Sequence, residues 1–112
     1  MNDEVKIYKF LGLAARAGCV DSGFDAVAGR ILKKEVKLLI LSRDISRNTL
    51  NKLLDLSSKT ELPSLSYSFG TMDELGNAIG KSGRALIAIT EQGFADKLSS
   101  MLDVFEYKEE DN

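Results

Sequence analysis

The residues best suited to bind a ligand lie at the start of one predicted helix. Ser22-Gly23-Phe24-Asp25 opens a helical stretch that is predicted to continue to residue 32. Unpaired backbone N–H groups and the helix dipole attract phosphate, and a glycine lets another backbone approach closely. Cations that could add phosphate contacts follow along the chain: Arg30, Lys33, Lys37 and Arg43. Because every helix has an N-terminus, this pattern alone is only a weak indication of an anion site.

A second candidate, Gly80-Lys81-Ser82, resembles the end of a nucleotide-binding phosphate loop. The full pattern requires a glycine five positions before Gly80, where this chain has Leu75, and Gly76 is one residue out of register. A phosphate loop also runs from a strand into a helix, whereas this loop follows a predicted helix and precedes a predicted strand. We therefore do not predict nucleotide hydrolysis.

The chain lacks the residues on which the commonest catalytic and metal sites depend. It has no histidine, and its one cysteine, Cys19, can form neither an internal disulfide nor a thiolate cluster. The carboxylates indicate no acid–base pair, since Asp21, Asp25 and Asp73 fit helix starts. Asp44 follows a strand, where α/β proteins often carry functional groups, but a turn before a helix is the simpler explanation. We therefore predict a protein that is not an enzyme and has no cofactor or metal.

The length indicates one domain, residues 1–112, large enough to bury its own core. An apolar fraction of 44% and a charged fraction of 29% are typical of soluble globular proteins. No apolar run is long enough to span a bilayer, and no signal segment opens the chain. We therefore expect a cytoplasmic protein with no membrane partner.

Charge is distributed unevenly along the chain, although the net charge is only −2. Residues 1–60 carry eleven Lys and Arg against seven Asp and Glu, whereas residues 61–112 carry four against ten. This asymmetry favours a basic face and an acidic tail region, although random scatter of solvated charge is also compatible with it. The tail, residues 106–112, is predicted to be acidic and frayed.

The hydrophobic periodicity predicts alternating helices and strands. Ser22, Ser46, Thr71 and Thr90 are the expected helix caps, and Leu50, Leu53 and Leu54 the expected inner face of the third helix. The expected segments are helices over 3–17, 22–32, from 46, 71–80 and from 90, with strands over 36–41, 65–69 and 85–89. Short connections between them indicate an α/β fold, a three-layer α/β/α sandwich with a small mostly parallel or mixed sheet.

Four segments, in order along the chain, resemble a known family. They are Leu-Gly-Leu-Ala-Ala-Arg-Ala-Gly at 11–18 with Ser22-Gly23 after it, then 41–44, 74–81 and 91–98. Together they are similar to the kink-turn-binding ribosomal-protein family (ribosomal proteins L-seven-Ae and L-thirty-e and relatives). The similarity is greatest to the small bacterial branch often encoded among translation and transcription factors, and it covers nearly the whole chain.

The resemblance implies a three-layer fold that binds a kink-turn, a sharply bent RNA, or ribosomal RNA. In the family, the second helix enters the RNA groove through a Gly-x-Asn-Glu-x-x-Lys segment, and a loop before the last strand packs against flipped-out nucleotides. Gly23 takes the motif's glycine position, and 81–84 takes the loop's. The RNA-binding candidates are Ser22, Gly23, Phe24, Asp25, Arg30, Lys33, Arg43, Lys81, Ser82, Gly83 and Arg84.

The rest of the motif differs in this chain. Asp25 stands where the family has asparagine, Ala26 where it has glutamate, and Gly29 where it has lysine. An aspartate cannot donate a hydrogen bond as an asparagine amide can. Two hypotheses follow: a non-catalytic RNA-binding protein of translation or the ribosome, or a family member that has lost kink-turn recognition and binds proteins instead. No DNA partner is expected.

Overall fold

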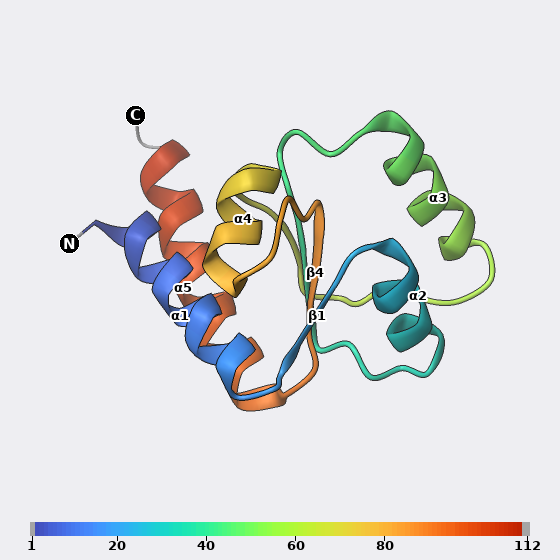
Figure 1. Ribbon diagram of the computed structural model, residues 1–112, viewed down its shortest axis with the longest axis horizontal. Coiled ribbons are helices and arrows are strands. Elements are labelled where there is room, and N and C mark those ends of the chain that lie inside the picture. Colours follow the sequence, from blue (N-terminus) through green and yellow to red (C-terminus); the bar gives the residue numbers. More distant parts are fainter. Residues whose placement is uncertain (1, 111–112) are drawn as a thin grey trace.

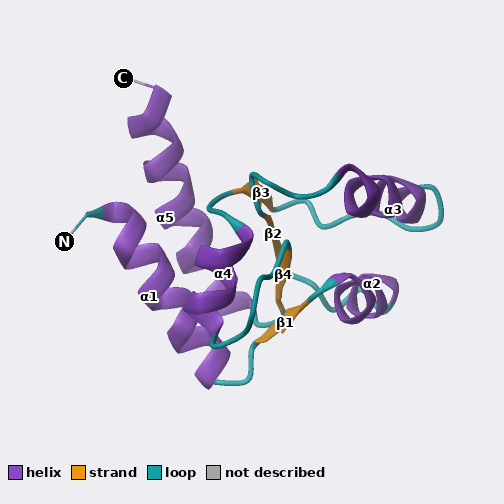
Figure 2. Cartoon of the chain, turned by 45° about the horizontal axis from the view of Figure 1, so that its top comes forward, coloured by secondary structure: helices purple, strands orange, loops and turns teal. Residues whose placement is uncertain are grey.

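The computed structural model describes residues 2–110 and contains, within that range, five helices and one four-stranded sheet. In chain order the elements are α1 (Asp3–Arg16), β1 (Val20–Ser22), α2 (Phe24–Leu32), β2 (Leu38–Leu41), α3 (Arg47–Ser57), β3 (Ser66–Ser68), α4 (Met72–Ile79), β4 (Leu86–Ile89) and α5 (Gln92–Glu110). Helices α1, α4 and α5 lie on one side of the sheet, and α2 and α3 on the other (Figure 1). A second view places the sheet between the two helical layers, so the predicted α/β/α sandwich is confirmed (Figure 2).

The sheet is mixed, with strand order β1-β4-β2-β3. Strand β4 runs antiparallel to both β1 and β2, and β2 runs parallel to β3. Among the described residues, the β2–β3 pairing is parallel and the other two are antiparallel. Of the two predicted forms, mostly parallel or mixed, the sheet is therefore mixed. The continuous apolar runs indicate that β2 and β4 are covered on both faces, but they carry no information about strand direction.

Alternate residues of the two central strands point into two separate cores. Leu38 and Ile40 of β2 pack with α1, α4 and α5, together with Ile87 and Ile89 of β4. Leu39 packs on the opposite side with residues of α2 and α3. This period of two follows from strand geometry, and both central strands are nearly fully buried.

The start of α2 differs from the prediction. Ser22 was expected to cap this helix, but it is the last residue of β1, and Gly23 is the N-cap. The missed strand β1 is three residues long and is held by antiparallel pairing of Val20 with Ile89 and Ser22 with Ile87. Such a short strand has no periodicity of its own, so only its partner reveals it.

The inner face of α3 also differs from the prediction. Leu53 is buried as expected, but Leu56 is the second buried leucine. Leu54 is 57% exposed and does not belong to the inner face, and Leu50, near the start of the helix, is still 37% exposed. Residues 53 and 56 are three apart and share one side of the helix, whereas 54 is turned away from it by about 100°.

Most predicted helix ends are confirmed. The Ser46 hydroxyl accepts a hydrogen bond from the Thr49 N–H, Thr71 and Glu74 form a capping box, and α4 ends at the left-handed Gly80. Thr90 does not cap α5: its hydroxyl donates to the Cys19 carbonyl. The Glu91 carboxylate caps this helix instead, accepting from the Gly93 and Phe94 N–H groups, and these bonds lower the pKa of Glu91.

Where fraying was expected over 106–112, α5 remains helical to Glu110, and residues 111–112 lie outside the described part of the chain. Across residues 2–110, no helix has both the length and the apolar character needed to cross a membrane.

Candidate nucleic-acid interface

The start of α2 is open in a way that the other helix starts are not. Among the described residues, no side chain caps α2, whereas Asn2, Ser46, Thr71 and Glu91 accept hydrogen bonds at the starts of the other helices. Gly23 has φ +86°, a conformation that favours glycine, and its N–H donates to the Leu86 carbonyl. The N–H groups of the first turn have no intrahelical acceptor, so this end can receive an anion.

The loop 81–84 is held firmly against α4. The Lys81 N–H donates to the Gly76 carbonyl at 2.8 Å, and the Arg84 N–H donates to the Met72 carbonyl at 3.0 Å. A Cβ atom on Gly76 would lie 2.8 Å from both the Gly83 nitrogen and the Lys81 oxygen. Gly76 is therefore the residue that lets this loop pack directly on the helix.

Arg84 joins the loop to the end of β1. Its Nε donates to the Ser22 hydroxyl at 3.0 Å, and its Nη1 donates to the carbonyls of Ser82 and Gly83. These bonds place Arg84 beside the residue that precedes the α2 N-cap. The structure thus brings together the two segments that the family resemblance singled out.

Between these segments lies a cleft of about 240 Å³. Its walls come from the end of β1, the starts of α2 and α3, and the approach to β4. It is lined by Ser22, Gly23, Phe24, Thr49, Gly83, Arg84, Ala85 and Leu86. Lys81 and Ser82 stand exposed on the loop beside it, and Asp25 is exposed on the first turn of α2.

The sequence interpretation missed the contribution of α3 to this site. Thr49, in the first turn of α3, lines the cleft, and the Lys52 ammonium lies 5.6 Å from the centroid of the Phe24 ring. A lysine at this distance from a ring face is attracted to it. Nothing in the local sequence marks these residues, because their role arises only from the packing of α3 beside α2.

Arg30 does not face the cleft freely. Its guanidinium forms ion pairs with Asp21 at 2.5 Å and with Glu35 at 3.1 Å. The hydrogen bonds to Asp21 and Glu35 raise the pKa of Arg30, so the group keeps its charge but shares it with two carboxylates. Arg30 therefore ties α2 to β1 and to the turn after α2.

Two further predicted residues lie away from the cleft. Lys33 is the C-cap of α2, at the opposite end of a nine-residue helix and about 13 Å along its axis. The Arg43 guanidinium lies 5.9 Å from the centroid of the Phe105 ring of α5, on the other helical layer. The cleft thus gathers Ser22, Gly23, Phe24, Gly83 and Arg84 but not Lys33 or Arg43.

One stripe of α2 contains two of the three positions at which the family motif is altered. Asp25 and Lys33 are exposed, and Gly29 lies between them at a spacing of four residues. A Cβ atom on Gly29 would meet no described heavy atom within 4 Å. The helix could therefore carry a side chain at 29, and the missing lysine has no steric cause.

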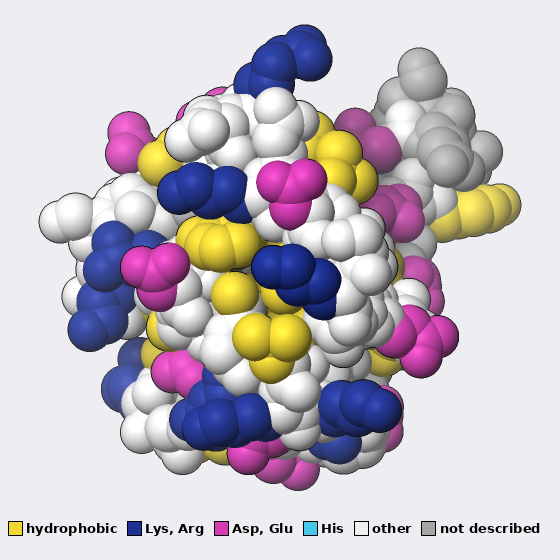
Figure 3. Space-filling view, turned by 90° about the vertical axis from the view of Figure 1, so that its right-hand side faces the viewer, with side chains coloured by type: hydrophobic (Ala, Val, Ile, Leu, Met, Phe, Trp, Pro, Cys, Tyr) yellow, Lys and Arg dark blue, Asp and Glu magenta, His cyan; other side chains and the backbone are white. Residues whose placement is uncertain are grey.

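The face formed by α2 and α3 is not uniformly basic. Apolar side chains gather at its centre, with both cations and carboxylates around them (Figure 3). The large apolar residues exposed on these two helices are Leu32, Leu50 and Leu54. This face therefore lacks the continuous positive charge typical of proteins that bind nucleic acid chiefly through phosphate.

The chemistry of the cleft suits an anionic ligand. Within residues 2–110, no group of three or more acidic or cysteine side chains could hold a metal ion. The polar groups of the cleft are backbone N–H groups, hydroxyls and one guanidinium, which can hydrogen-bond an anionic ligand.

Comparison with known sequences identifies the class of protein. The chain belongs to the ribosomal protein L7Ae/L30e/S12e/Gadd45 family, which it matches over residues 5–99. That span includes both the start of α2 and the loop 81–84.

Two relatives are each named RNA-binding protein YlxQ. The one from Bacillus subtilis (strain 168) is 41% identical over 96 residues, which cover 86% of this chain and 94% of the relative. The one from Enterococcus faecium is 31% identical over 98 residues, which cover 88% and 92%.

Two solved structures share the fold of this chain. A protein with unknown function from Bacillus halodurans C superposes with a TM-score of 0.77 at 37% identity, covering 89% of this chain and 99% of that chain. The Giardia lamblia 15.5kD RNA binding protein superposes with a TM-score of 0.68 at 13% identity, covering 91% and 88%. At that identity the second likeness shows the fold alone.

Proposed function

We propose that this chain binds a structured RNA through the cleft between the start of α2 and the loop 81–84. The observation that carries the proposal is an uncapped helix start held beside a rigid loop by the Arg84–Ser22 hydrogen bond. Membership of the L7Ae family and the RNA-binding names of two relatives support it.

The cleft offers two kinds of contact to RNA. A phosphate can accept hydrogen bonds from the first-turn N–H groups of α2, at Phe24, Asp25 and Ala26, where the helix dipole favours negative charge. An unstacked base can pack on the exposed backbone of the loop at 82–83 or on Phe24. Recognition of this kind depends on RNA shape more than on the number of cations.

The proposal extends to a kink-turn or a similarly bent RNA, encountered in the cytoplasm on the ribosome or during translation. Asp25 places a carboxylate next to the proposed phosphate site, and Gly29, on the same side of α2, lacks the positive charge of the family's lysine. We therefore expect this chain to bind more weakly than one with the complete motif. We also expect a modest dependence on salt, since few cations contact phosphate.

A titration with two RNAs tests the proposal. A labelled kink-turn RNA and an unkinked duplex of equal length are titrated at about 50 mM and about 200 mM salt. The proposal predicts tighter binding of the kink-turn, by at least about tenfold, at both salt concentrations. Equal weak binding of both RNAs would contradict bent-RNA recognition, and no binding at low salt would contradict RNA binding altogether.

The second candidate function is protein binding in place of RNA binding. It is favoured by the altered motif at Asp25, Ala26 and Gly29 and by the exposed Leu32 and Leu54 on the same face. Pull-down with and without nuclease separates the two functions. A protein partner that persists after nuclease treatment supports this candidate, and a partner lost on nuclease treatment contradicts it.

A further inference from the structure

A second concave surface lies between α1 and α5, in the helical layer on the other side of the sheet from α2 and α3. It is a groove of about 560 Å³ to which both helices contribute. The Lys108 ammonium on α5 donates to the Asp3 carboxylate on α1 at 2.7 Å. Because this bond joins the start of α1 to the end of α5, the two helices run antiparallel along the groove.

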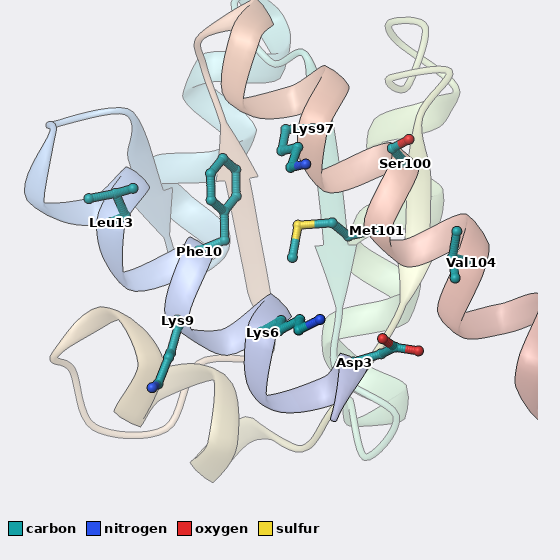
Figure 4. Close-up of a pocket in the computed structure, with 9 residues that line it drawn as sticks. All are labelled: Asp3, Lys6, Lys9, Phe10, Leu13, Lys97, Ser100, Met101 and Val104. Atoms are coloured by element: carbon teal, nitrogen blue, oxygen red, sulfur yellow. The ribbon is translucent and has the colours of Figure 1, made fainter. Parts of the chain in front are cut away.

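The groove has an apolar centre. Phe10 of α1 and Met101 of α5 face each other across it (Figure 4), and both are only partly buried. Leu13 and Val104 extend the same surface and are 48% and 49% exposed. Exposed apolar side chains that adjoin one another in a concave surface are typical of a binding site.

Lysines flank the apolar centre of this surface. Figure 4 shows Lys97 on one side of Phe10 and Met101 and Lys6 on the other, and Lys9 also lines the groove. Among the described residues, none of the three forms an ion pair within 4 Å. The Asp3 carboxylate is already bound to Lys108, and this bond lowers the pKa of Asp3. The charge left available to a ligand is therefore positive.

The two helices present the same spacing of residue types. In α1 the order is Lys6, Phe10 and Leu13, and in α5 it is Lys97, Met101 and Val104, with steps of four and three residues in each. Because the helices are antiparallel, the two lysines lie on opposite sides of Phe10 and Met101 (Figure 4). A ligand that matches this arrangement is apolar in the middle and acidic on both flanks.

We propose that this groove binds an acidic amphipathic helix of another protein. The groove follows α1 from residue 3 to 13, a rise of about 15 Å, so it accommodates roughly three turns of a helix packed between two others. Charge complementarity selects the acidic partner: the rim is cationic, although the chain as a whole has a net charge of −2. RNA fits less well, because phosphates would not cover four apolar side chains.

The test uses a fluorescent peptide of roughly eighteen residues with a central leucine stripe that is flanked on both sides by glutamates. A matched peptide has lysines in place of the glutamates. The proposal predicts saturable binding of the acidic peptide to the full chain and at least about tenfold weaker binding of the basic one. Equal binding of both peptides, or of neither, would overturn it.

Charge reversal locates the binding. The double variant Lys6→Glu/Lys97→Glu should bind the acidic peptide at least about tenfold more weakly and should gain affinity for the basic peptide. Lys59→Glu, on an exposed residue after α3, is the control and should change neither. Thermal unfolding verifies folding, and Lys6→Gln/Lys97→Gln provides a milder variant. Failure of the reversed variant to exchange its peptide preference would contradict the assigned groove.

The same variants distinguish the acidic helix from two other occupants, an RNA and a second copy of this chain. If the charge reversal weakens binding of the kink-turn RNA as much as binding of the peptide, the groove is an RNA surface and the proposal fails. If the chain alone dimerises and the reversal abolishes the dimer, the occupant is a second copy and the proposal fails. The outcome is independent of the proposed RNA cleft, since Lys81→Ala should leave peptide binding unchanged.

Discussion

The cleft at the start of α2 and the groove between α1 and α5 are built from different parts of the chain. The cleft is made largely of backbone: a glycine N-cap with φ +86°, a loop packed on Gly76, and carbonyls bound by Arg84. The groove is made of side chains, apolar at its centre and cationic on both sides of that centre. We therefore expect glycine positions to determine the shape of the cleft and its affinity for RNA, whereas charge and apolar contacts determine which ligand the groove binds.

The variant with the largest expected effect on the cleft, and none on the groove, is Gly76→Ala. The new Cβ would lie 2.8 Å from backbone atoms of Lys81 and Gly83, so the loop must move. We expect RNA affinity to fall by about tenfold or more and the free energy of unfolding to fall by about 1–3 kcal/mol. Peptide binding at the groove should not change.

The matched control for that variant is Gly29→Ala, whose Cβ would meet no described atom within 4 Å. It should raise the free energy of unfolding by up to about 1 kcal/mol and leave RNA affinity unchanged. RNA titration and denaturant unfolding measure both variants. Equal RNA affinities for the two would contradict the role assigned to the loop.

The next largest effect is expected for Gly23→Ala. With φ +86° and open space around its Cβ, this position tests backbone conformation rather than a clash. Because Gly23 has φ +86° and ψ 154°, the strain should cost roughly 1–3 kcal/mol of stability, and a changed α2 start should weaken RNA binding several-fold. Gly18→Ala is the control: Gly18 has φ +76° and equally open space, but it lies away from the cleft. If both variants weaken RNA binding equally, the α2 start has no special role.

A gain is expected for Gly29→Lys, which restores the family's cation on the stripe of α2 that contains Asp25 and Lys33. Low-salt RNA affinity should rise by about two- to fivefold, and the slope of log K against log salt should steepen by about 0.7–0.9. Gly29→Gln is the control for the added side chain without its charge. A rise of equal size in both variants would show that charge is not the cause.

The smallest effect is expected for Lys81→Ala, on the exposed loop. Losing one phosphate contact should weaken RNA binding by about two- to threefold and flatten the salt slope by somewhat less than one. Lys59→Ala, an exposed lysine beyond the end of α3, should do neither. A similar loss in both would indicate non-specific attraction rather than a site.

Local signals in the sequence predict much of the fold. The Thr71–Glu74 capping box, the Ser46 cap and the left-handed Gly80 occur where the residue types place them, because each depends on contacts a few positions apart. The apolar runs that become β2 and β4 also appear in the sequence, because both strands are buried on two faces.

Contacts between distant parts of the chain could not be predicted in this way. Strand β1 exists because it pairs with β4, and Ser22 bonds to Arg84, which lies 62 residues away in the chain. The Arg43 guanidinium lies near the Phe105 ring, which is also distant in the chain and belongs to the opposite helical layer. Of the candidate site, the sequence therefore predicted the glycine start and the loop, but not which cations lie beside them.

The most direct test of the RNA-binding cleft is an amide chemical-shift titration of the isotopically labelled protein with a kink-turn RNA. The proposed function predicts the largest shifts at the first turn of α2 and in the loop 81–84, including the Phe24 and Gly83 amides. Residues of the α1–α5 groove, such as Lys6 and Met101, should be unaffected. Shifts centred on that groove, or no shifts at saturating RNA, would contradict the account.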